Sequence, residues 1–144
     1  MNEKFFLKLL ELSAAHAKRS QIIFEKLNLS NAQPKVLYIL RTIDGCTQKE
    51  LASVCKVTPP SMTSILNNME KADFIYREKT LTNNGKHAHR VYLTKKGKIT
   101  AEKVYSEFEK LENLCLKGFS DEEKLHVFEI FEKITENLNS RTDL

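Results

Sequence analysis

Small hydroxyl and amide side chains recur between residues 58 and 71, at a spacing that places them on one face of a helix. Such short side chains approach base edges and phosphates closely, and Asn pairs with adenine through two hydrogen bonds. Faces open only to solvent are usually rich in Glu and Lys, yet this face has no acid before Glu70. The pattern therefore favours contact with nucleic acid over a plain polar surface. The residues expected to form this contact are Thr58, Pro60, Ser61, Thr63, Ser64, Asn67, Asn68 and Lys71.

Cations gather in and after a predicted hairpin, LTNNGKHAHRVYLT at residues 81–94. An Asn-Gly pair between two strand-like runs is typical of a tight turn, so we expect strands over about 75–80 and 88–93. Cations at the hairpin tip suit a minor groove, and lysines in the first turn of the next helix oppose its dipole unless a phosphate is near. The contacts expected here are Arg77, Lys86, His87, Arg90, Lys95, Lys96 and Lys98.

Charge is divided unevenly along the 144 residues. Residues 47–98 hold ten Lys and Arg against four Asp and Glu, whereas residues 99–144 hold six against eleven. This division indicates a chain that meets a polyanion through one segment, although a basic face kept for solvation is the alternative that charge alone leaves open. No run of about 18 apolar residues occurs, and charges interrupt the apolar N-terminus. We therefore expect a soluble cytoplasmic protein without a membrane partner.

Motifs for catalysis are missing from the sequence. We find no Gly-rich phosphate loop, no His-Glu-x-x-His and no spacing that would join Ser, His and an acid. We therefore expect no enzyme activity, no catalytic residue, no cofactor and no metal. His87 and His89 stand two residues apart in the hairpin, where contact with DNA is favoured over a metal site. His16 and His126 are expected to be structural histidines.

The three cysteines bear on whether the protein senses oxidants. Cys55 and Cys115 fall at apolar positions of helical patterns and are expected to be small buried hydrophobes. Cys46 precedes a helix start, and we expect it to be partly exposed, with a pKa that the helix end could lower. A thiol-based redox-sensing regulator is therefore kept as an alternative. The odd number and wide spacing indicate neither a disulfide framework nor a zinc site.

Helix-capping patterns predict the elements that position these residues. Ser or Thr followed three residues later by Gln or Glu occurs at 30–33, 47–50 and 120–123, and Thr58 precedes a Pro at the first helical position. The short third helix, a turn of about three residues and the fourth helix form a helix-turn-helix, which the hairpin makes a winged helix. The helices are expected over about 3–27, 31–43, 48–55, 59–72, 95–117 and 121–139.

Apolar stripes on the first and the last two helices need a partner surface. Phe128, Phe131 and Leu138 follow the spacing of an amphipathic helix, and a small winged helix has little surface to cover such stripes. A two-fold dimer covers them, and packing within one chain is the alternative. The residues expected at the dimer interface are Phe5, Phe6, Leu9, Phe128, Phe131, Ile134 and Leu138.

The chain resembles the MarR family of bacterial transcriptional regulators over nearly its whole length. LASVCKVTPPSMTSILNNMEK is similar to the family's recognition-helix segment, and RVYLTKKGK is similar to the end of its wing. The resemblance implies an obligate homodimer that reads adjacent major grooves of a pseudo-palindrome, often under the control of a small ligand or an oxidant.

The chain departs from the family pattern in the wing and at two helix ends. Gly85, Lys86 and His87 stand where typical members have Asp-Arg-Arg, so the wing keeps a cation and lacks the Asp. Lys56 and Asp73 stand where glycine is frequent, and each can adopt a left-handed conformation at some cost.

We therefore predict a mainly α fold, a winged helix-turn-helix with long N- and C-terminal dimerisation helices. Residues 1–29 form the N-terminal dimerisation helix, 30–98 the DNA-binding region and 99–144 the C-terminal dimerisation helices, all in one structural domain. The recognition helix spans about 59–72 and the wing about 75–93. The predicted function is a homodimeric, sequence-specific repressor on double-stranded DNA, which a small-molecule effector of unknown identity could release. A winged-helix module that binds protein without DNA is the alternative from another class.

Overall fold

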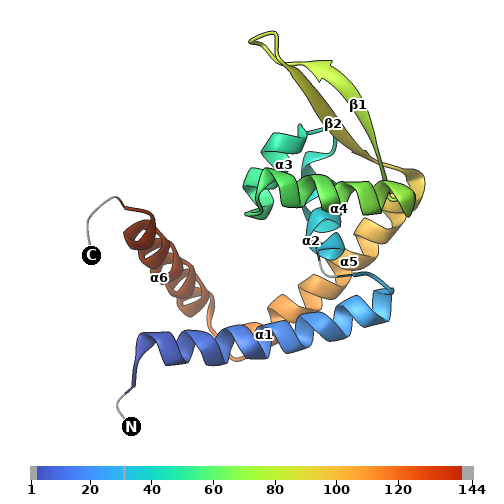
Figure 1. Ribbon diagram of the computed structural model, residues 1–144. Helices are drawn as coiled ribbons and strands as arrows, with labels where there is room; N and C mark the ends of the chain where they lie inside the picture. The colour runs from blue at the N-terminus through green and yellow to red at the C-terminus, as the bar shows by residue number, and fades with distance from the viewer. Residues whose placement is uncertain (1–2, 31, 141–144) are drawn as a thin grey trace. The chain divides into compact units, whose positions relative to one another are not determined.

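The computed structural model describes residues 3–30 and 32–140 (Figure 1). The elements are α1 (Phe5–Leu27), α2 (Gln33–Ile43), α3 (Gln48–Cys55), α4 (Pro59–Lys71), β1 (Ile75–Leu81), β2 (His87–Leu93), α5 (Lys95–Cys115) and α6 (Asp121–Asn139). This order confirms the predicted mainly α fold with one hairpin. By its internal contacts the chain divides into two compact units, Met1–Glu109 and Lys110–Leu144. Among the described residues, no helix is long and apolar enough to cross a membrane.

The core of the first unit forms where α2, α3 and α4 meet the base of the hairpin. Leu37, Leu40, Leu51, Met62 and Leu66 have no exposed surface. Their spacing turns one face of each helix inward, and burying a side chain of this size contributes about 1.5–3 kcal/mol. Three residues join α3 to α4, so the two helices form the predicted helix-turn-helix.

Three of the four predicted helix caps are confirmed. Thr47 and Ser120 each form a capping box with the Glu three residues further on, and the Thr58 hydroxyl accepts a hydrogen bond from a backbone N–H of α4. α2 keeps half of the predicted capping box, because the Ser30 N–H donates to Gln33 Oε1 at 3.2 Å, whereas Ala32, which precedes the helix, offers no side-chain cap. The predicted start near residue 31 lies outside the described residues. Pro34 sets this start, since proline fits only the first turn of a helix.

Lys56 and Asp73 end α3 and α4 in the left-handed conformation, with φ of 58° and 63°. The Lys56 N–H donates to Ser53 O at 3.2 Å, and the next N–H donates to Ala52 O at 3.1 Å, so two of the last four carbonyls of α3 are satisfied. Asp73 closes α4 in the same way. The left-handed conformations anticipated at these two departures from glycine are therefore confirmed.

The hairpin pairs β1 with β2 in antiparallel register, from Ile75 opposite Leu93 to Leu81 opposite His87. Residues 82–86 join the two strands: the Thr82 N–H donates to Lys86 O at 2.8 Å, the Gly85 N–H donates to Thr82 O at 2.9 Å, and Gly85 has a φ of 74°. Glycine takes this positive φ without steric cost, which confirms the Asn-Gly turn. Both strands extend one residue nearer the tip than predicted.

The loop before α3 pairs with β2 through an isolated β-bridge, Thr47 opposite Arg90, which the sequence did not reveal. The Gly45 N–H donates to Val91 O at 2.8 Å, and the Val91 N–H donates to Cys46 O at 2.9 Å. The Leu93 N–H donates to Asp44 Oδ1 at 2.8 Å. These bonds tie the end of β2 remote from the tip to the helix-turn-helix, so the wing leaves the core from a fixed base.

Gly97 allows the first turn of α5 to pack against the start of β1. A Cβ added at Gly97 would lie 2.0 Å from Phe74 O, so no larger residue fits without movement of the backbone. The Gly97 N–H donates to Thr94 Oγ1 at 2.9 Å, which caps the helix. The contact fixes where α5 leaves the winged helix.

Apolar side chains on α1 and α6 remain exposed in the single chain. Phe6 on α1 is 65% exposed, Phe131 on α6 is 54% exposed, and α6 buries none of its residues. Ile134 is half-buried, and the other residues predicted at the dimer interface are exposed: Phe5, Phe6, Leu9, Phe128, Phe131 and Leu138.

Candidate nucleic-acid interface

The predicted contact face of α4 is exposed from end to end. Met62, Leu66 and Met69 point into the core with no exposed surface, which leaves the opposite side of the helix to solvent. Every residue predicted on this face is exposed: Thr58, Pro60, Ser61, Thr63, Ser64, Asn67, Asn68 and Lys71. The helix therefore presents the short polar side chains that base edges and phosphates accept.

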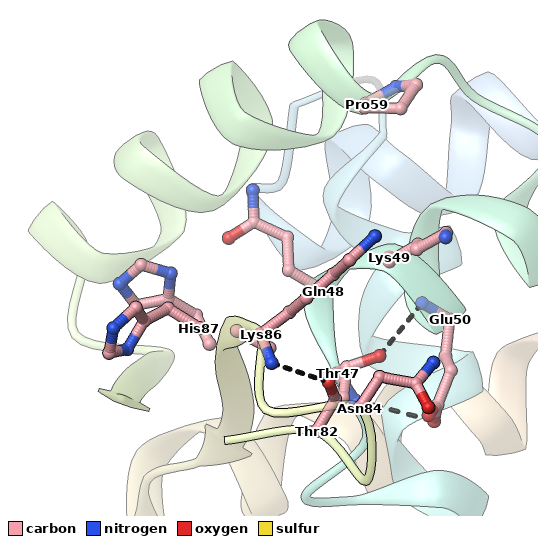
Figure 2. A pocket seen from close by; sticks show the side chains of 11 residues that line it. Thr47, Gln48, Lys49, Glu50, Pro59, Thr82, Asn84, Lys86 and His87 are labelled. Atoms are coloured by element: carbon pink, nitrogen blue, oxygen red, sulfur yellow. Dashed lines mark hydrogen bonds between the residues drawn. The ribbon is translucent and has the colours of Figure 1, made fainter. Parts of the chain in front are cut away.

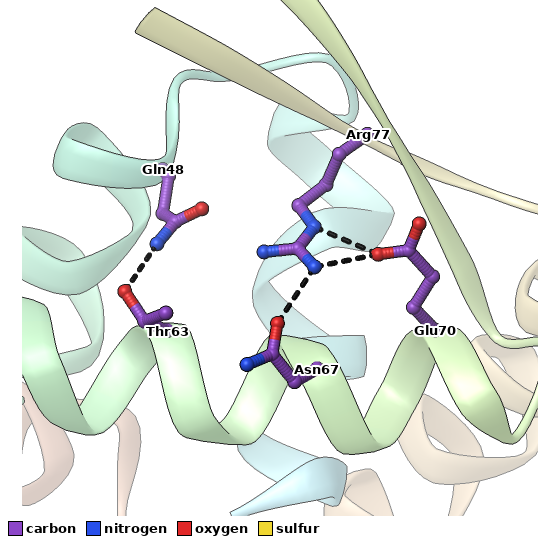
Figure 3. Close-up of polar contacts among 5 residues, drawn as sticks. All are labelled: Gln48, Thr63, Asn67, Glu70 and Arg77. Atoms are coloured by element: carbon purple, nitrogen blue, oxygen red, sulfur yellow. Dashed lines mark hydrogen bonds and ion pairs between the residues drawn. The ribbon is translucent and has the colours of Figure 1, made fainter.

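Gln48, the first residue of α3, holds Thr63 in place on α4 (Figure 3). Gln48 Nε2 donates to Thr63 Oγ1 at 2.8 Å, and Thr63 Oγ1 donates to Pro59 O at 3.1 Å. A hydroxyl has one proton, so Thr63 cannot donate to a base while it keeps this bond. Its methyl group remains for apolar contact, such as with the methyl of thymine. The sequence did not predict Gln48 as a site residue, although its place within the capping box at 47–50 was a usable signal.

Arg77 reaches from β1 to the exposed face of α4 (Figure 3). Its Nε and Nη2 donate to Glu70 Oε2 at 2.9 and 2.6 Å, and Nη2 also donates to Asn67 Oδ1 at 2.8 Å. The Arg77 side chain is 19% exposed. The sequence predicted Arg77 as a contact to the DNA backbone, whereas the structure joins its guanidinium to the recognition helix.

Two more of the predicted backbone contacts are bonded within the chain. Arg90 is half-buried, and its Nη1 donates to Gly45 O at 2.9 Å. Lys96 Nζ donates to Ala72 O at 2.7 Å and lies 4.7 Å from the centroid of the Phe74 ring. Both cations tie the hairpin and α5 to the helix-turn-helix, a role that the sequence did not reveal. The other predicted cations are exposed: Lys86, His87, Lys95 and Lys98.

A groove of about 580 Å³ lies between the starts of α3 and α4 and the wing (Figure 2). Lys49 and Lys86 give the groove positive charge, and Glu50 is partly engaged, because its Oε2 accepts a hydrogen bond from the Thr47 N–H at 3.4 Å. Lys49 is a further candidate that was not predicted from the sequence, and His89, for which contact with DNA was favoured over a metal site, also lines the groove. The residues lining the groove are Thr47, Gln48, Lys49, Glu50, Pro59, Thr82, Asn84, Lys86, His87, Ala88 and His89.

Two predictions about the cysteines are wrong. Cys46 is buried, and burial raises the pKa of its thiol to about 11, with the nearby Glu50 carboxylate adding to the rise. Cys46 lies in the loop that is hydrogen-bonded to β2, and this pairing had no signal in the sequence. Cys115 is exposed in the single chain instead of buried. Cys55 is buried as predicted, and burial raises the pKa of its thiol. Within residues 3–30 and 32–140, no group of three His, Cys, Asp or Glu is placed to hold a metal ion.

A helix-turn-helix with an exposed polar second helix, followed by a hairpin with a cationic tip, defines a winged-helix DNA-binding protein. The family model described as MarR family matches residues 29–86. YwoH of Bacillus subtilis (strain 168), an uncharacterized HTH-type transcriptional regulator, is 32% identical over 118 residues, which are 80% of this chain and 84% of the relative. The chain belongs to the MarR family of transcriptional regulators. It is therefore a regulator that binds DNA, and not an enzyme.

Solved structures agree on the fold. The MepR–DNA complex of S. aureus has a TM-score of 0.79 at 24% identity, over 96% of this chain and 100% of that one. A regulator from Listeria monocytogenes, complexed with a 26mer DNA, has a TM-score of 0.80 at 24% identity, over 95% of this chain and 90% of that one. Both are likenesses of fold.

Proposed function

We propose that the protein is a sequence-specific repressor that binds a pseudo-palindromic DNA site as a homodimer. α4 lies in the major groove, where Ser61, Ser64 and Asn68 meet base edges, and the wing tip reaches the minor groove with Lys86 and His87. One observation carries this proposal: the exposed face of α4 presents short polar side chains with no acid before Glu70, beside a groove lined by lysines and histidines.

The groove under the wing is the proposed path of the sugar-phosphate backbone between the two DNA grooves. Lys49 on α3 and Lys86 on the wing line it from opposite elements (Figure 2), so a strand passing between them meets a cation on each side. Phosphate contacts of this kind set register and affinity without reading sequence. Lys95 and Lys98, exposed in the first turn of α5, are proposed to contact phosphates further along the strand.

Dimerisation is supported by the exposed apolar faces of α1 and α6. Phe6 and Leu10 on α1 are more than half exposed, as are Phe128 and Phe131 on α6. Soluble monomers rarely expose apolar surface of this extent. In a two-fold dimer the apolar surface of one chain packs against the same surface of its partner. The dimer also brings two copies of α4 to the two half-sites of one operator, about 34–36 Å apart along the duplex.

Control by a small ligand is the part of the proposal that rests on the family resemblance. A ligand that binds the free dimer more tightly than the DNA-bound dimer lowers the dimer's affinity for DNA. DNA lowers the dimer's affinity for the ligand by the same factor. A compound that raises the melting temperature of the protein and also weakens operator binding would meet this requirement.

Selection of bound fragments from a random duplex library tests the proposal. We expect the purified protein to enrich an inverted repeat with half-site centres about 10 base pairs apart. Ser64→Ala and Asn68→Ala are expected to change the enriched sequence, whereas Lys103→Ala, an exposed cation on α5 away from the proposed face, should leave it unchanged. Recovery of no duplex at about 50 mM salt would overturn the proposal, because the phosphate contacts are strongest there.

A further inference from the structure

Arg77, Glu70 and Asn67 form one hydrogen-bonded group on the outer face of α4 (Figure 3). Arg77 comes from β1, and its guanidinium holds the Glu70 carboxylate with two N–H groups and the Asn67 amide with one. The arginine is 19% exposed and the glutamate 43%, so solvent screens the ion pair less than it screens a pair standing free on the surface. The group is therefore a fixed part of the surface that meets DNA.

The chemistry of arginine decides which way the Asn67 amide faces. A guanidinium has donors and no acceptor, so the amide oxygen must be the atom that meets Arg77, at 2.8 Å. The amide nitrogen then stands on the other side of the group, pointing away from Arg77 in Figure 3. Asn67 thus presents two N–H donors outward, while a charged donor already engages one of the two lone pairs of its oxygen.

This orientation changes what Asn67 can read in a major groove. Asn recognises adenine when its nitrogen donates to N7 and its oxygen accepts from the N6 amino group. N7 is present on both purines, and only the second bond separates adenine from guanine. Because Arg77 already engages one of the two lone pairs of the oxygen and fixes the direction of the amide, the second bond is weakened and adenine loses most of its advantage over guanine.

We infer that Arg77 is a positioning residue for specificity: it holds Asn67 as a donor-only reader that accepts either purine, and it pairs Glu70 away from the phosphates. The inference rests on the proposed function, because it requires α4 to lie in the major groove. Asn68, whose side chain has no hydrogen bond within the described part of the chain, keeps both halves of its amide available for adenine.

The test compares base preference in three variants. In Arg77→Met/Glu70→Gln both charges are removed, so Asn67 is released and no unpaired carboxylate faces the DNA. Arg77→Lys keeps the positive charge but removes the planar guanidinium fork that spans Glu70 and Asn67. Lys79→Met is the matched control, because it removes a cation from an exposed position of the same strand. Thermal melting of each variant first establishes that it is folded.

Affinities are measured for duplexes in which the base pair read by Asn67 is varied. That pair is the one at which Asn67→Ala changes the preference. The wild type is expected to bind adenine and guanine there within about threefold of each other, and the double variant to prefer adenine by about tenfold. Replacing that adenine by purine, which lacks the N6 amino group, should weaken only the double variant. Arg77→Lys should fall between the two, and Lys79→Met should weaken all duplexes equally.

Two results separate this inference from the proposed function. A wild type that enriches no duplex overturns both. A wild type that enriches an operator, but whose preference between adenine and guanine is the same in the double variant, overturns only the role of Arg77. A wild-type protein that already prefers adenine by about tenfold at the base pair read by Asn67 would also overturn the role of Arg77. The amide oxygen of Asn67 would then be free to accept a hydrogen bond from adenine.

Discussion

The polar side chains on the outer face of α4 differ in their freedom to turn toward a base. The Thr63 hydroxyl and the Asn67 oxygen are held by Gln48 and Arg77, whereas the side chains of Ser64 and Asn68 have no hydrogen bond within the described part of the chain. A side chain already held in place loses less conformational entropy on binding. The held residues therefore give a rigid pattern, and the free ones adapt to the bases they meet.

Removing the cation at the wing tip should weaken binding to every DNA sequence alike. In the Lys86→Ala variant we expect lower affinity for the operator and for unrelated duplexes, with the slope of log affinity against log salt reduced by about 1, because one fewer phosphate is neutralised. Titration of labelled duplexes at several salt concentrations measures both quantities. Lys103→Ala serves as the control, and equal slopes for Lys86→Ala and the wild type would remove the wing tip from the interface.

The Cys46 thiol should be inert in the native protein. Its raised pKa, about 11, keeps it protonated at pH 8, and the thiolate is the reactive form. We expect a thiol reagent at pH 8 to modify Cys46 only after the protein unfolds. We also expect that peroxide does not change operator affinity by oxidising Cys46. Because the native thiol holds its proton more tightly than the unfolded one, its contribution to stability is lost as pH rises from 9.0 toward 11. Rapid native modification of Cys46, located by peptide mapping, would restore the redox alternative.

The exposed face of α4 could be predicted from the sequence, but the hydrogen-bond partners of its side chains could not. The spacing of Met62, Leu66 and Met69 fixed which side of α4 is exposed, since a helix with one apolar stripe has one polar face. The partners of Thr63 and Asn67 come from residues 48 and 77, on other elements. Sequence spacing carries no signal for hydrogen bonds between distant elements. The sequence therefore predicted DNA contacts, and no bonds within the chain, for Arg77, Arg90 and Lys96.

The wing and α5 are held to the helix-turn-helix by backbone contacts at their bases. Asp44 and Gly45 bond to the inner end of β2, and Gly97 lets α5 approach the residue before β1. The capped helices and the Asn-Gly turn were predictable because capping and turn formation depend on neighbouring residues. The pairing of the loop near residue 45 with β2 was not, because so few residues take part that they show no period.

Adding one methyl group at Gly97 should destabilise the protein. In Gly97→Ala the new Cβ would meet Phe74 O, a backbone atom that cannot turn aside, and we expect a loss of about 1–3 kcal/mol in the free energy of unfolding. Chemical denaturation measures this loss. Ser106→Ala, at an exposed position of the same helix, is the control and should change stability by less than about 0.5 kcal/mol. Equal stability of the two variants would show that α5 does not pack as closely as described.

Binding to a pseudo-palindromic site, as proposed, requires two copies of the chain. Many large apolar side chains of α1 and α6 are exposed in the single chain. The amphipathic pattern that places them on one face was predictable from the sequence. What the sequence cannot supply is the choice between packing within a chain and packing between chains, because both need the same apolar stripe. The partition at residues 29 and 98 and the homodimer therefore stay predictions.

Charge placed in the apolar faces should separate the dimer. For Phe6→Glu/Phe128→Glu we expect a species of 16.6 kDa in sedimentation equilibrium, where the wild type gives twice that mass. Burying an unpaired carboxylate at an interface is strongly unfavourable, so the monomer is preferred. Loss of the dimer should also lower operator affinity, because each half-site is then bound by a single chain. Lys8→Ala, on the same exposed helix, controls for loss of surface charge. A dimeric double variant would place the interface elsewhere.

The salt dependence of binding to the selected operator shows whether α4 and the wing form the DNA interface. A duplex carrying the enriched site is titrated with wild-type protein from about 50 to 200 mM salt. If α4 and the wing form the DNA interface described here, the affinity should fall by at least about a hundredfold over that range, because several lysines release counterions from the phosphates. An affinity that does not change with salt, or no binding at the lowest salt, would contradict the account.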